Sequence, residues 1–183
     1  IFGVCREIIK RGGTLAGFNT VFSGDVPLGA GMSSSAALES TYAFALNELF
    51  NLGIDKFELA RIGQSTEHNY VGVKCGIMDQ FASVFGKQGN LMRLDCRSME
   101  FEYFPFDPEQ HGYKLVLLNS CVKHELVGSP YNDRRASCER VSKILGQEFL
   151  RGATMEQLDA IKDQISEEDY IRARYVIGEE RRV

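Results

Sequence analysis

The chain has little of what several functional classes require. Its 5 cysteines contain no C-x-x-C pair and its 3 histidines are dispersed, so the sequence indicates neither a disulfide framework, nor a zinc site, nor a Ser/His/Asp triad. The net charge is -4 and the basic residues are scattered, which gives no reason to expect a nucleic acid or an anionic membrane as partner. Apolar runs such as 115–118 are too short to span a bilayer, and no signal-peptide pattern opens the chain, so we expect a cytoplasmic protein.

A glycine- and serine-rich loop between a strand-like run and a helical pattern is the most informative segment. Its Gly29 and Gly31 allow tight backbone turns, and three consecutive serines crowd the point where the helix must begin. The unpaired N–H groups and positive dipole of a helix N-terminus favour an anion, so the loop is a candidate phosphate site. The alternative is an ordinary glycine turn that serine caps before a helix.

Two well-known phosphate-binding motifs do not fit this loop. Gly24 and Gly29 have the spacing of a P-loop, but Ala30 stands where that motif needs lysine. The dinucleotide fingerprint fails as well, because Ser34 replaces its third glycine and no alternating strands and helices surround it.

A second polar cluster lies further along the chain. Asp79 is expected in the first turn of a short helix, and Glu67 near the end of the preceding helix, so the loop between them could bring both carboxylates to one site. The alternatives are that Asp79 only interacts with the helix dipole and that Glu67 is a solvated surface residue. A third cluster lies at the start of a later helix, where a solvated face is the alternative; it consists of Tyr131, Asn132, Arg134 and Arg135.

Hydrophobic periodicity and capping residues predict the elements around these clusters. Segregated helices and strands, rather than strict alternation, indicate an α+β fold. We expect a domain boundary near Pro108, giving domains 1–108 and 109–183. The predicted helices are 4–10, 34–51, 55–70, 77–85 and 129–145, with two more starting at Thr154 and Ser166; the predicted strands are 15–26, 91–96, 100–106 and 113–119. On the helix 77–85, the side chains expected on one side are Met78, Phe81, Ala82 and Phe85.

Three segments together resemble the galactokinases, which belong to the GHMP small-molecule kinases. Gly24 to Glu39 closely resembles their ATP-binding motif. Glu67 to Tyr70, followed by Cys75 to Gln80, is similar to the stretch that carries their catalytic aspartate, and Leu126 to Arg135 is similar to a segment near the sugar. The resemblance covers essentially the whole chain, in order and at the expected spacing.

The resemblance implies a GHMP kinase fold, with part of a ribosomal-protein-S5-like N-terminal domain followed by part of a ferredoxin-like C-terminal domain. It implies phosphorylation of galactose at the C1 hydroxyl with ATP and Mg²⁺, and no obligate protein partner is evident. Asp79 would activate or orient that hydroxyl, Gly76 and Tyr131 would contact the galactose, and Ser35 and Glu67 would bind magnesium. The residues implied to wrap the ATP phosphates are Gly29, Ala30, Gly31, Met32, Ser33, Ser34 and Ser35.

Two motifs of these kinases are not found in this sequence. One is the N-terminal sugar-binding motif of the Gly-Glu-His-x-Asp-Tyr type, with the arginine before it, and the other is a glycine-rich C-terminal motif. Because the chain also starts at Ile1 and stops inside a helical pattern, we expect a piece of a longer protein that would not phosphorylate galactose alone. The alternatives are a related kinase acting on N-acetylgalactosamine, and a galactose and ATP sensor that regulates transcription. The segment Cys75 to Met78 favours a galactokinase over an N-acetylgalactosamine kinase. The intact Ser35 and Ala36 favour a galactokinase over a sensor.

Overall fold

The computed structural model describes residues 1–118 and 131–183, which fall into two compact units, Ile1–Val127 and Gly128–Val183. The predicted boundary near Pro108 stays a prediction. The described part of the first unit contains helices α1 (Phe2–Lys10), α2 (Ser34–Leu49), α3 (Lys56–Thr66) and α4 (Met78–Phe85), with a π-helical turn at Glu67–Val71 and a 3₁₀ turn at Glu109–His111. It also contains the strands β1 (Asn90–Leu94) and β2 (Phe101–Pro105), so the α+β expectation holds.

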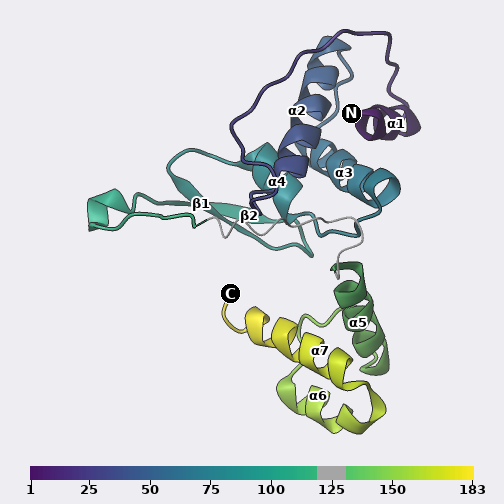
Figure 1. The fold of residues 1–183 in the computed structure, drawn as a ribbon, viewed down its shortest axis with the longest axis vertical. Helices are drawn as coiled ribbons and strands as arrows, with labels where there is room; N and C mark the ends of the chain where they lie inside the picture. Colours follow the sequence, from purple (N-terminus) through teal and green to yellow (C-terminus); the bar gives the residue numbers. More distant parts are fainter. Residues whose placement is uncertain (119–130) are drawn as a thin grey trace. The chain divides into compact units, whose positions relative to one another are not determined.

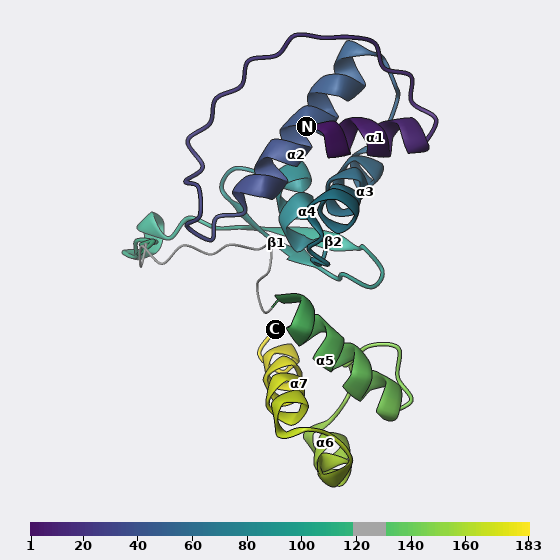
Figure 2. The ribbon, with the colours of Figure 1, turned by 45° about the vertical axis from the view of Figure 1, so that its right-hand side comes forward.

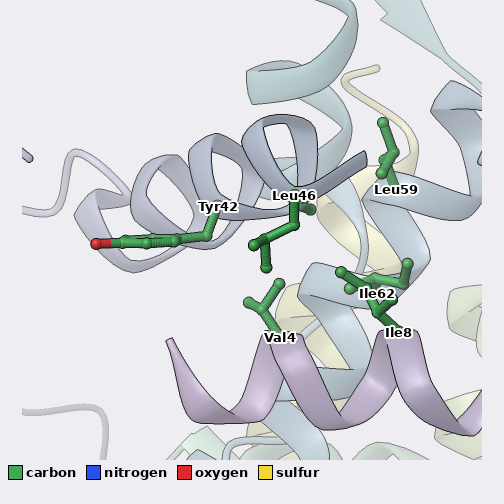
Figure 3. Packing of buried hydrophobic residues seen from close by; sticks show 7 residues of the cluster. Val4, Ile8, Tyr42, Leu46, Leu59 and Ile62 are labelled. Carbon is green, nitrogen blue, oxygen red and sulfur yellow. The ribbon is translucent and has the colours of Figure 1, made fainter. Parts of the chain in front are cut away.

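The core of the first unit lies where α1, α2 and α3 meet. Figure 3 shows Val4 and Ile8 of α1 pointing toward Leu46 of α2 and Ile62 of α3. These side chains are at most 1% exposed, and burial of such apolar groups stabilises the unit by about 25 cal/mol per Å². Leu59, Ala60 and Ile62 form the buried face of α3.

A second cluster of buried side chains packs α4 against the β1–β2 hairpin. The two strands pair antiparallel, with Met92 opposite Tyr103. Phe81 and Phe85 stack with ring centroids 4.2 Å apart and lie against Phe101 of β2. The prediction for the buried face of α4 was wrong in part, because Met78 is 65% exposed and Ala82 is also exposed. The buried side chains of α4 are instead Gln80, Phe81, Val84 and Phe85.

The strand predicted at 15–26 is absent, since this segment runs from α1 to α2 as an extended arc without a paired neighbour among the described residues (Figures 1 and 2). The strand predicted at 113–119 is likewise absent over 113–118, while Asn119 lies outside the described residues. A strand needs a hydrogen-bonding partner as well as an alternating sequence, and neither segment has one here. Val21 is 100% exposed and Leu118 is 91% exposed.

The described part of the second unit is helical. It contains α5 (Tyr131–Ile144), α6 (Met155–Ala160), a 3₁₀ turn at Lys162–Gln164, and α7 (Glu167–Glu180). The predicted caps are confirmed: Thr154 and Gln157 form a capping box, and the Ser166 side chain accepts a hydrogen bond from the Asp169 N–H. Ser129 and Pro130, the expected start of α5, lie outside the described residues. No helix in the described ranges is long and apolar enough to cross a membrane.

Candidate active site

The glycine- and serine-rich loop, residues 29–35, is called the serine loop below. Three of its residues have a left-handed backbone conformation before or at the start of α2. Gly29 has φ +70°, Gly31 has φ +72° and Ser33 has φ 55°. A Cβ atom at either glycine would meet nothing within 4 Å, so the backbone conformation rather than crowding calls for glycine. The helix starts at Ser34, and Ser33 provides no side-chain cap in the structure. The first-turn N–H groups of α2 therefore lack a capping side chain from this position and suit a phosphate.

Glu67 lies at the junction of α3 and the π-helical turn and is only 2% exposed. The reading of Glu67 as a solvated surface residue is therefore wrong. Its two carboxylate oxygens are buried and accept no hydrogen bond from any described residue. Its backbone carbonyl accepts hydrogen bonds from the N–H groups of Gly72 and Val73, at 2.8 and 3.1 Å. A buried carboxylate without a partner is costly, and π-helical turns are frequent at functional sites.

The loop between Glu67 and Asp79 is held at the Cys75 carbonyl. That oxygen lies 2.8 Å from His68 Nε2 and accepts a hydrogen bond of 3.3 Å from Gln64 Nε2. These contacts fix the backbone just before Gly76, which is exposed and where an added Cβ would meet nothing within 4 Å. Gly76 therefore presents open backbone that a ligand can approach closely.

Asp79 lies in the first turn of α4 and is partly exposed. Its backbone carbonyl accepts a hydrogen bond of 2.9 Å from Ser83 Oγ. Burial and then the charge of Glu67 raise the pKa of the Cys75 thiol to about 11, and the charges of Glu39 and Asp79 also contribute. The α4 helix that carries Asp79 packs against α3, which ends directly before Glu67.

Sequence reasoning missed Glu39, which is 6% exposed on α2. Burial and then the charge of Glu67 raise the pKa of Glu39 to about 8, while a hydrogen bond of 3.4 Å from Gln80 Nε2 opposes the rise. A signal was present in the sequence: Glu39 is three residues after Ala36 and four before Ala43, within the stripe that faces the core. A charged residue in such a stripe points to a buried polar cluster.

Tyr131, the other expected sugar contact, is the first residue of α5 in the second unit and is 41% exposed. Its role stays a prediction. A cavity of about 600 Å³ on the first unit contains none of the predicted site residues; it is lined by Ala37, Ser40, Thr41, Phe44, Ala45, Glu48 and Ser83.

The donor set suits a magnesium ion held mainly by its waters and by substrate phosphates. Within 1–118 and 131–183, no group of three or more His, Cys, Asp and Glu side chains could hold a metal ion. Glu67 nevertheless has two buried oxygens without a protein partner, and Mg²⁺ needs as few as one or two protein oxygens. The chemistry of the Glu67 carboxylate therefore suits such an ion, and the magnesium role of Ser35 and Glu67 stays a prediction.

Comparison with known proteins identifies the class of protein to which the N-terminal part of the chain belongs. Residues 1–87 match the family model of the GHMP kinases N terminal domain. This part of the chain therefore belongs to the GHMP kinases.

Galactokinases are among the relatives that match nearly the whole chain. The chain is 43% identical to the galactokinase of Thermotoga neapolitana over 183 residues, which is 100% of this chain and 51% of that protein. It is 44% identical to a galactokinase of Homo sapiens over 170 residues, which is 92% of this chain and 42% of the human protein.

A solved structure agrees with these sequence matches. The crystal structure of Lactococcus lactis galactokinase complexed with galactose superposes with a TM-score of 0.77 at 30% identity, and the match covers 98% of this chain and 47% of that one. The α+β fold is thus that of a GHMP kinase. The chain spans about half the length of the curated relatives it matches.

Proposed function

We propose that the protein containing this chain transfers the γ-phosphoryl group of ATP to the C1 hydroxyl of galactose, giving galactose 1-phosphate and ADP. The observation that carries the proposal is the buried Glu67 carboxylate, which has no hydrogen-bond partner among the described residues and directly follows α3, a helix that packs against α4 with Asp79 in its first turn. Glu67 directly follows α3 and Asp79 lies on α4, and both of these helices pack against α2, which begins at the end of the serine loop. The similarity to galactokinases supports the same reaction.

The serine loop is the proposed site for the ATP phosphates, through residues 29–35. The left-handed backbone at Gly29 and Gly31 turns the chain sharply before α2. The N-terminus of α2 then offers N–H groups and a positive dipole to negative oxygens. Ser35 and Glu67 are the proposed magnesium ligands, and a bound Mg²⁺ would neutralise charge that develops on the phosphates.

Asp79 is the proposed catalytic residue. Its carboxylate accepts the proton of the C1 hydroxyl while that oxygen bonds to the γ-phosphorus, and the bond from the γ-phosphorus to the oxygen leaving with ADP breaks. This reaction needs positioning and charge stabilisation more than covalent chemistry, and a fixed aspartate on α4 suits it. Gly76, on the loop fixed through Cys75, and Tyr131 are the proposed contacts of the sugar.

The proposed compartment is the cytoplasm. Cys5, Cys75 and Cys138 are free thiols, as expected for a protein kept in a reducing environment. The proposed substrates are galactose and ATP, with no nucleic acid or membrane partner.

A coupled assay of ADP release by the full-length protein tests the proposal. Galactose, N-acetylgalactosamine and glucose are offered in turn, to the wild type and to the Asp79→Ala variant. We expect turnover with galactose, and a loss of about 10² to 10⁴ in kcat for the variant, because it lacks the positioned base. Equal turnover by the variant would contradict the role of Asp79. Turnover of N-acetylgalactosamine without galactose would contradict the choice of substrate.

A further inference from the structure

A buried polar cluster lies behind the proposed magnesium ligand. It consists of Glu39 on α2, Gln80 on α4 and Gly63 on α3, beside Glu67. Gln80 is 2% exposed, and its Nε2 donates one hydrogen bond to Glu39 Oε2 at 3.4 Å and another to Cys75 Sγ at 3.9 Å. None of the proposed chemical steps uses these side chains, although burying two neighbouring carboxyl groups and an amide is costly.

Gly63 shows how closely the three helices approach one another here. A Cβ atom at this position would lie 2.8 Å from Gln80 Cγ and 3.6 Å from Glu39 Oε2. Glycine inside a helix is destabilising relative to alanine, so this position keeps it for close packing. The aliphatic part of Gln80 therefore rests on the backbone of α3, which limits the positions that its amide group can take.

Each member of the cluster is close in sequence to one proposed site residue on its own element. Glu39 follows Ser35 by one helical turn, and Gly63 precedes Glu67 by one helical turn. Gln80 directly follows Asp79. The hydrogen bond between Gln80 and Glu39 thus joins the helix of the serine loop to the helix of the proposed catalytic aspartate.

We infer that Gln80 and Glu39 are positioning residues for the magnesium nucleotide, which rests on the proposed function. Their hydrogen bond holds the starts of α2 and α4 together and keeps the Glu39 carboxyl group beside Glu67. The Glu67 carboxylate is then directed toward the cation. Partners of this kind, which orient a metal ligand, typically affect metal affinity or activity by about 10 to 100-fold.

An exchange of the two groups tests this inference in the full-length protein. Gln80→Glu places another carboxylate in the cluster and removes the donor. The double variant Glu39→Gln with Gln80→Glu restores an amide and a carboxylate in reversed order. Glu48→Gln, at an exposed position of the same helix α2, is the matched control.

The readout is calorimetric titration with a magnesium complex of a non-hydrolysable ATP analogue, alongside the KM values for ATP and galactose and thermal melting. We expect Gln80→Glu to weaken binding of the complex by about 10-fold or more and to raise the KM for ATP, with the KM for galactose changed less than about twofold. The double variant is expected to recover most of the binding, and Glu48→Gln to bind as the wild type does.

Two outcomes would overturn the inference: a double variant that binds no better than Gln80→Glu, or equal changes in both KM values. A wild type that binds the magnesium complex but does not phosphorylate galactose would contradict the proposed function alone. If the variants then show the expected pattern of binding, the positioning role stands.

Discussion

Two buried carboxylate clusters in the first unit differ in how their charge is balanced. Glu7 of α1 is 3% exposed and accepts hydrogen bonds from Lys10 at 2.7 Å, Arg11 at 2.6 Å and Asn69 at 2.9 Å. Glu67 is equally buried, but no basic or amide side chain among the described residues donates to its carboxylate.

The electrostatics of the two clusters differ accordingly. Burial by itself raises the pKa of Glu7, but the hydrogen bonds from its partners outweigh burial and hold the pKa below its ordinary value. In the other cluster, burial and the charge of Glu67 raise the pKa of Glu39. The compensated cluster joins α1 to the end of α3 and stabilises the fold. The uncompensated cluster leaves acceptors for a cation, as functional sites often do.

Replacing glutamate by glutamine, at Glu67 in one variant and at Glu7 in another, gives the largest expected contrast in activity and stability. We expect Glu67→Gln to lower kcat/KM for ATP by at least about 100-fold, because a neutral amide is a poor ligand for magnesium. Stability should be unchanged or higher, since the amide can donate to Glu39. The measurements are steady-state kinetics and urea denaturation of the full-length protein. A clear loss of stability with normal kinetics would mean that Glu67 is structural.

Glu7→Gln is the matched control and should show the reverse. We expect a loss of about 2 kcal/mol in the free energy of unfolding, because charge-assisted hydrogen bonds from Lys10 and Arg11 are lost or weakened. The kinetic constants should stay within about twofold of the wild type. Urea denaturation checks the first expectation, and the coupled assay checks the second. A variant as stable as the wild type would remove the contrast between the clusters.

Asp169 in the second unit is a carboxylate whose charge is balanced by Arg140. Removing this partner should change stability less than the substitutions above, with a defined pH dependence. The Arg140 guanidinium holds the pKa of Asp169 at about 2, below the ordinary 3.8. The folded state therefore gains stability from this group above pH 3.8 and loses it as the pH falls toward 2.

Arg140→Ala should lower the stability of α5 and α7 at neutral pH, because the ion pair with Asp169 is lost. The loss should be small, because Arg140 is largely solvated. Amide hydrogen exchange at a series of pH values measures this loss of stability. The difference from the wild type should shrink below pH 3.8. A difference that grows there instead would contradict the assignment.

Local signals predicted the helices well, because caps and periodicity act within a few residues. The Asp55 side chain accepts a hydrogen bond from the Glu58 N–H at 2.9 Å, as its position in the sequence indicates. The segments 15–26 and 113–118 show the limit of such signals. Their apolar residues suit strands, but a strand forms only with a partner that the local sequence does not specify.

The sequence was enough to predict the individual residues of the candidate site. It was not enough to predict the buried residues that support them. Glycines, serines and carboxylates at particular spacings marked the serine loop, Glu67 and Asp79. Glu39 and Gln80 come together from helices 41 residues apart in sequence, and no local pattern links them. No local pattern marks the role of Gly63 either, because that role depends on how closely α4 approaches α3.

Thermal melting of the full-length protein and of Glu67→Gln, with and without Mg²⁺ and a non-hydrolysable ATP analogue, tests the central claim most directly. If the unpaired Glu67 is there for the cation, the variant will melt no lower than the wild type without ligand and will lose most of the rise in Tm that the magnesium nucleotide produces. A variant that melts lower without ligand, yet gains as much from the magnesium nucleotide as the wild type, would contradict the account.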